Sequence, residues 1–186
     1  MDRRLLITAF ACWPLAGAAA EDEGQRPRFR ISAGQLHKAL SARFPVRLGL
    51  PGLLELEITA PSLHLLPRRN QLGATLQAQA GGPALRQIRH GELDVMFTPR
   101  YESADQTVRA RDMEIVDLRL PGLPAETLQA LRGLLPALAR EVVGEVVLHR
   151  FSQRELAVAD TLGFEPEQLT VAEDGLVVEF TRKRRP

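Results

Sequence analysis

Cysteine is almost absent from this chain, whose 186 residues contain one, Cys12. A single thiol cannot close an internal disulfide, and it cannot supply a site that needs several thiolate ligands. The folded protein must therefore obtain its stability from its core alone.

An excess of charge of one sign is also lacking. The chain has 24 Lys and Arg residues against 23 Asp and Glu residues, for a formal net charge of +1. Proteins that bind nucleic acid need a basic surface that replaces the phosphate counterions. The charge balance therefore excludes nucleic acid from the partners that we predict.

Motifs that carry chemistry are missing as well. No G-x-S-x-G elbow, P-loop or G-x-G-x-x-G turn follows any predicted strand. The histidines His37, His64, His90 and His149 are scattered without the spacing of a metal site, and we predict surface or packing roles for them. The sequence thus predicts a protein that is not an enzyme, with no catalytic residue, no metal and no cofactor.

Residues 1–20 have the pattern of an export signal. Arg3 and Arg4 precede an apolar run, and small residues at Ala18 and Ala20 fit a cleavage site after Ala20. The run is shorter than the roughly twenty apolar residues of a membrane span. We therefore expect a periplasmic protein with a short arm at residues 21–27. The alternative is a lipoprotein anchored to the membrane through Cys12.

One domain is predicted over residues 28–181, and it opens with a short strand and a helix. Phe29 and Ile31 alternate with arginines, as in a strand, and Ser32 with Gln35 matches a capping box that starts a helix. Pro45 ends this helix.

From Val46 to Leu120 the apolar residues recur with a period of two. This alternation is typical of strands with one wet face, and the short links between them predict an antiparallel meander. The phase slips at Ile115 and Val116, which predicts a β-bulge in a long strand.

A long helix is predicted from Pro124 to Arg150, bent at Pro136, with a broad apolar stripe. A shorter helix from Gln153 to Leu162 and two closing strands follow, at residues 168–172 and 176–181. Residues 182–186 form a basic tail.

In this order of elements the chain resembles the YceB-like family of bacterial envelope lipoproteins, whose function is not established. The resemblance rests on residues 31–36, 48–52, 113–117 and 134–138. Members of that family are similar in fold to the tubular lipid-binding (BPI-like) proteins. The fold class that we expect is therefore α+β: a curved antiparallel β-meander wrapped around one long bent helix, with shorter N- and C-terminal helices.

The surplus of apolar surface without catalytic groups favours a non-enzymatic envelope protein that binds a lipid or other apolar ligand between the long helix and the sheet. The predicted lining consists of Leu54, Leu56, Ile58, Leu72, Leu76, Leu93, Val95, Phe97, Leu128, Leu131, Leu135, Leu138 and Val142. The alternative is an envelope scaffold protein with a closed core and no ligand. A weak contact with the membrane surface is a further hypothesis, through Arg182, Lys183, Arg184 and Arg185.

Overall fold

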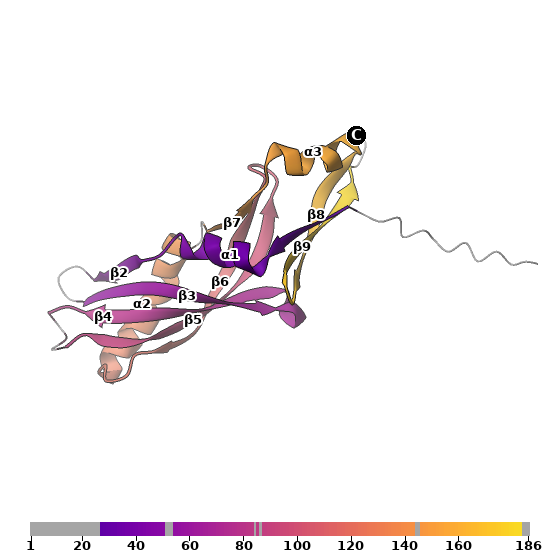
Figure 1. The fold of residues 1–186 in the computed structure, drawn as a ribbon. Coiled ribbons are helices and arrows are strands. Elements are labelled where there is room, and N and C mark those ends of the chain that lie inside the picture. The colour runs from indigo at the N-terminus through magenta and orange to yellow at the C-terminus, as the bar shows by residue number, and fades with distance from the viewer. Residues whose placement is uncertain (1–26, 51–53, 84, 86, 144–145, 184–186) are drawn as a thin grey trace, which may run out of the picture.

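The computed structural model describes residues 27–50, 54–83, 85, 87–143 and 146–183. These residues form nine strands, three α-helices and one 3-10 turn (Figure 1). The predicted export signal with Cys12, most of the predicted arm, and Arg184 and Arg185 lie outside the described residues.

Six strands form the main sheet, and each is antiparallel to the next in the order of the chain. The predicted meander is thus confirmed. Its strands are β2 (Val46–Leu50), β3 (Leu54–Leu66), β4 (Gln71–Gly81), β5 (Arg89–Glu102), β6 (Thr107–Arg119) and β7 (Val147–Arg150), with the 3-10 turn η1 (Pro67–Arg69) between β3 and β4.

The two ends of the described chain meet in a second, three-stranded sheet. Its order is β1 (Arg28–Ser32), β9 (Gly175–Arg182) and β8 (Phe164–Ala172). β9 therefore ends at Arg182, a residue that we had expected in the basic tail. Gly175 allows β1 to approach closely, because a Cβ on this residue would lie 2.1 Å from the Ile31 carbonyl oxygen.

Capping boxes start two of the helices. Ser32 caps α1 (Ala33–Ser41), with Gln35 closing the box as predicted. Ser152 and Glu155 form the same motif at the start of α3 (Gln153–Thr161). In each box the serine hydroxyl accepts the third amide proton of the helix, which would otherwise lack a partner.

The remaining helix, α2 (Ala125–Val143), is shorter than predicted. The described residues form three α-helices, and α2 is not a single long helix around which the sheet wraps. The prediction that it reaches Arg150 was wrong. Val147–Arg150 form β7, which pairs with Thr107–Arg109 of β6. The first residues of β6 would otherwise be an open sheet edge, and pairing this edge outweighs the helical spacing of Val142 and Val146.

The main sheet curls so far that α1 contacts strands near both of its edges. At one end of the sheet β2 pairs with the first part of β3, and α2 packs against β6. At the other end α1 contacts both β3 and β7 (Figure 1). α1 therefore bridges the edge strand β7 and β3, which has no strand partner among the described residues on its outer side beyond Ile58.

Bulges sharpen the curl. The register between β5 and β6 shifts at Asp94 and Val95, opposite Val116, which is 54% exposed. The bulge predicted at Ile115 and Val116 is thus confirmed. A second shift separates Thr59 from Ser62 in β3. Each extra residue bends its strand and increases the local twist.

Candidate functional site: the concave face of the main sheet

The inner face of the curled sheet is a continuous apolar surface. Cross-strand pairs such as Ile58 with Ala78 and Leu76 with Leu93 place the apolar residues of neighbouring strands on one face. Because successive strand residues point to opposite faces, the period of two in the sequence becomes one dry face and one wet face.

The structure brings most of the predicted lining together, with eight residues on this face and two on α2. Ten of the thirteen predicted residues are between 0% and 4% exposed: Leu54, Leu56, Ile58, Leu72, Leu76, Leu93, Val95, Phe97, Leu131 and Leu135. Leu128 is partly buried against them. The side chains of Leu138 and Val142 lie outside the part of the chain that is described.

Small residues occupy much of the inner face of β4. Ala74, Ala78 and Ala80 alternate there with leucines, and Ala78 lies opposite Gly91 of β5. Gly91 is required by close packing, since a Cβ would lie 1.8 Å from the Arg119 carbonyl oxygen of β6. Short side chains at these positions project less far from the sheet than the neighbouring leucines do.

In its described part, residues 125–137, the helix over this face buries few side chains of its own. Between residues 125 and 137 of α2, only Leu131 and Leu135 are buried, whereas the neighbouring Leu134 is 38% exposed. Arg132 adds a polar contact, since its Nη2 donates to the Leu118 carbonyl oxygen of β6 at 3.2 Å. Helices with a small buried area are the elements of a fold that open most readily.

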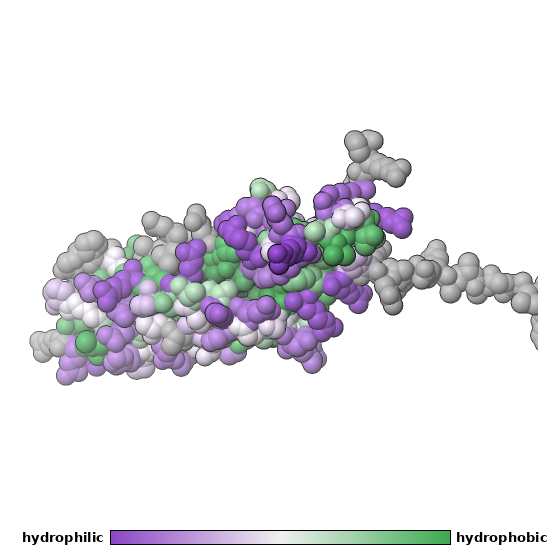
Figure 2. Space-filling model, turned by 45° about the horizontal axis from the view of Figure 1, so that its top comes forward, coloured by the Kyte–Doolittle hydropathy of each residue, from purple (hydrophilic) through white to green (hydrophobic). Residues whose placement is uncertain are grey.

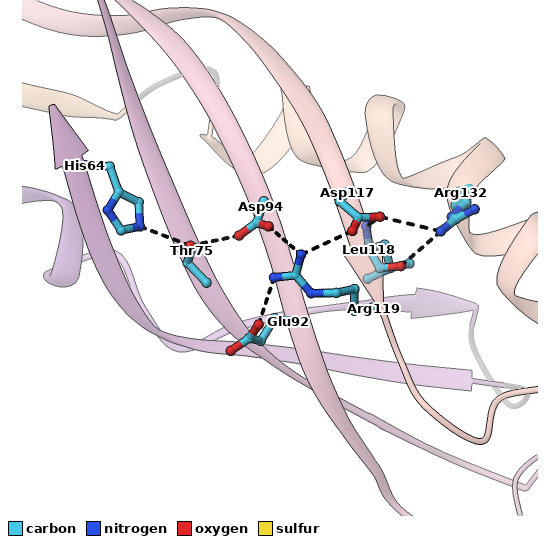
Figure 3. Close-up of polar contacts among 8 residues, drawn as sticks. All are labelled: His64, Thr75, Glu92, Asp94, Asp117, Leu118, Arg119 and Arg132. Carbon is cyan, nitrogen blue, oxygen red and sulfur yellow. Dashed lines mark hydrogen bonds and ion pairs between the residues drawn. The ribbon is translucent and has the colours of Figure 1, made fainter. Parts of the chain in front are cut away.

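A row of polar contacts crosses the outer face of the same strands (Figure 3). Arg119 lies at its centre, with its guanidinium 2.8 Å from Glu92, 2.9 Å from Asp94 and 3.2 Å from Asp117. The hydrogen bond to Glu92 contributes most to raising the pKa of Arg119, and the charge of Asp94 follows.

The row extends from Arg119 to both sides. Thr75 of β4 donates to Asp94 at 2.8 Å and lies 3.1 Å from the Nε2 atom of His64 in β3. Asp117 lies 3.6 Å from Arg132 of α2. Side chains from β3, β4, β5, β6 and α2 are thus linked on the wet face, behind the apolar surface (Figure 3).

A partly buried histidine marks the junction between the two sheets. The His149 ring lies 5.4 Å from the Phe29 ring and 4.8 Å from the Phe151 ring, measured between centroids. Its Nε2 atom has no hydrogen-bond partner among the described residues, and Glu155 Oε1 lies 3.8 Å away. Burial lowers the pKa of His149, and the negative charge of Glu155 opposes this effect in part. The packing role predicted from the sequence is therefore confirmed for His149.

Other kinds of site find no support in the described residues. Within them no group of three or more His, Cys, Asp or Glu residues could hold a metal ion. None of the described helices combines the length and the apolar character that a membrane crossing requires.

The fold and the concave face define an α+β protein built on a curled antiparallel sheet. The chain matches no protein family profile, and no curated protein matches it. Among solved structures it is similar to a lipopolysaccharide-binding protein, with 14% sequence identity and a TM-score of 0.39. The match covers 85% of this chain and 41% of that protein, so the chain spans less than half of its neighbour's length. Membership of the YceB-like family stays a prediction.

Proposed function

We propose that this protein binds an apolar ligand, such as a lipid acyl chain, between α2 and the concave face of the main sheet. The supporting observation is a continuous apolar face covered by a helix that buries only two of its residues between 125 and 137. The proposal includes an envelope location after export, with a mature N-terminus at Glu21, and a role without catalysis.

Access to this face requires a movement of α2. The inner residues are at most 4% exposed, so a ligand reaches them only when α2 separates from β6. Each methylene that leaves water contributes about 0.8 kcal/mol, so ten methylenes contribute about 8 kcal/mol. This gain is large enough to offset the opening of a lightly anchored helix and part of the cost of association, which is about 4–15 kcal/mol.

The same burial supports a second candidate function. Residues that are covered to this degree also suit a closed core, in which case the protein acts as an envelope scaffold through its outer surface. The two candidates differ in whether any molecule enters the space between α2 and the sheet.

Two phenylalanine variants on neighbouring residues of β4 separate the candidates. Ala78→Phe adds a ring to the inner face, where Ala78 is 3% exposed, whereas Gln77→Phe adds the same ring to the wet face. Protein purified from its own envelope is extracted with organic solvent for lipid mass spectrometry, and its free energy of unfolding is measured in urea.

The ligand hypothesis predicts lipid in the wild type and in Gln77→Phe, and a loss of lipid in Ala78→Phe. A closed core predicts no lipid in any of the three proteins. Overpacking would then destabilise Ala78→Phe by about 1–3 kcal/mol. This second result would contradict the ligand hypothesis.

A further inference from the structure

A surface groove follows α1 and the second half of β3, where α1 packs beside the edge of the sheet. It consists of three adjoining depressions with volumes of about 410, 580 and 500 Å³. The first and second share His37, and the second and third share Leu65 and Glu173. We call this surface the α1–β3 groove.

Apolar side chains line the groove over most of its length. Phe44 lies in the first depression, Leu63 in the second, and Leu65 in the second and third. All three are partly buried, with one side against the core. Figure 2 shows one face of the molecule, on which apolar residues in green lie between polar residues in purple.

The groove is long enough for one acyl chain. Along β3 it extends from Thr59 to Leu66, and at about 3.3 Å per residue this distance is roughly 23 Å. One leaflet of a bilayer has about 15 Å of hydrocarbon, half of the roughly 30 Å core.

Positive charge gathers at one end of the groove. Arg68 and Arg69 of η1 line the third depression, and Glu173 is the one carboxylate among its lining residues. Both arginines are exposed. Arg69 donates to the Met96 sulfur at 3.5 Å, and neither guanidinium has a carboxylate partner among the described residues.

We propose that the α1–β3 groove binds the acyl chain of an anionic lipid, with the headgroup held by Arg68 and Arg69. The apolar lining accounts for the chain, and two guanidinium groups without a carboxylate partner among the described residues account for the sign of the headgroup. A peptide strand suits the groove less well, because α1 already occupies the place beside the open edge of β3. Leu63 and Leu65 share the sheet face of Ala74 and Leu72, but the groove opens at the edge of the sheet beside α1. None of its described lining residues belongs to α2, so this site does not depend on the movement of that helix.

Gly34 offers a way to fill the groove without disturbing the fold. It lines the second depression, and a Cβ built on it meets no atom within 4 Å. Gly133 of α2 has the same open surroundings and lies away from the groove, so Gly133→Phe is the matched control for Gly34→Phe.

The binding probe is dansyl-labelled undecanoic acid, with its uncharged methyl ester for comparison. We expect Gly34→Phe to raise the Kd of the acid at least tenfold, while Gly133→Phe leaves it unchanged. The double variant Arg68→Gln/Arg69→Gln should raise the Kd of the acid about threefold to tenfold and leave that of the ester unchanged. Arg154→Gln in α3 removes an exposed positive charge elsewhere and serves as its control.

Competition experiments identify the source of the anion. Vesicles of phosphatidylglycerol should displace the acid, whereas vesicles of phosphatidylcholine and inorganic phosphate should not. Displacement by phosphate alone would overturn the lipid assignment in favour of a free anion site.

Equal affinity of Gly34→Phe and Gly133→Phe for the acid would overturn the groove site. If Ala78→Phe no longer binds the acid but Gly34→Phe still does, the probe binds on the concave face. That result would support the proposed function and contradict the groove, so failures of the two proposals can be distinguished.

Discussion

Leu135→Ala tests how firmly α2 is held on the sheet. Leu135 is 1% exposed and is one of the two buried residues of α2 between residues 125 and 137. Its truncation removes buried methyl groups and leaves a cavity, which costs about 2–5 kcal/mol when the surroundings cannot collapse. The neighbouring Leu134 is 38% exposed, so Leu134→Ala should change the stability by less than about 1 kcal/mol.

The assay is urea unfolding followed by far-ultraviolet circular dichroism, with protein freed of lipid by refolding. Hydrogen exchange of the α2 amides adds a local measurement, and we expect these amides to exchange faster in Leu135→Ala than in Leu134→Ala. A loss of stability below about 1 kcal/mol for Leu135→Ala would refute the packing described here, because Leu135 would then border a void.

Three further predictions concern other parts of the molecule. His149→Phe should flatten the pH dependence of stability between pH 7 and 5, as measured by urea titrations at several pH values. Burial lowers the pKa of His149 in the folded state. The contribution of His149 to stability is therefore complete above its unfolded-state pKa of about 6.5, and it is lost as the pH falls toward its folded-state pKa. Asn70→Ala should lower the free energy of unfolding in urea by about 1–3 kcal/mol. The Asn70 side chain donates to the Leu169 carbonyl oxygen at 2.9 Å and accepts from the Val171 amide at 2.7 Å. Equal stability of Asn70→Ala and wild type would contradict this role. Intact mass of the exported protein should show an N-terminus at Glu21, whereas a diacylglyceryl-modified chain that begins at Cys12 would contradict it.

Local patterns in the sequence determined much of the fold. The alternation through Leu54, Leu56 and Ile58 set the buried face of β3, and the slip at Ile115 and Val116 located a bulge. The capping box at Ser32 and Gln35 fixed the start of α1. These predictions succeeded because each depends on neighbours within a few residues, where the backbone period and the hydrogen-bonding groups decide the structure.

The end of α2 shows where such patterns fail. Leu148 is buried within β7 and Val146 is buried directly before it, although Val146 also continues a helical spacing from Val142. A short apolar run fits both periods, and the open edge of β6 decides between them. No local pattern in the sequence indicates that β6 has an open edge at this place.

The candidate site divides in the same way. The sequence by itself determined which side chains are apolar and which of them share a face of a strand, so most of the concave lining could be predicted. Only the tertiary structure decided that α1 bridges β3 and β7, that Asn70 binds β8 about a hundred residues further along the chain, and that the α1–β3 groove ends at Arg68. These features join elements far apart in the chain, and their positions depend on how much the sheet twists and bends, which is a property of all its strands together.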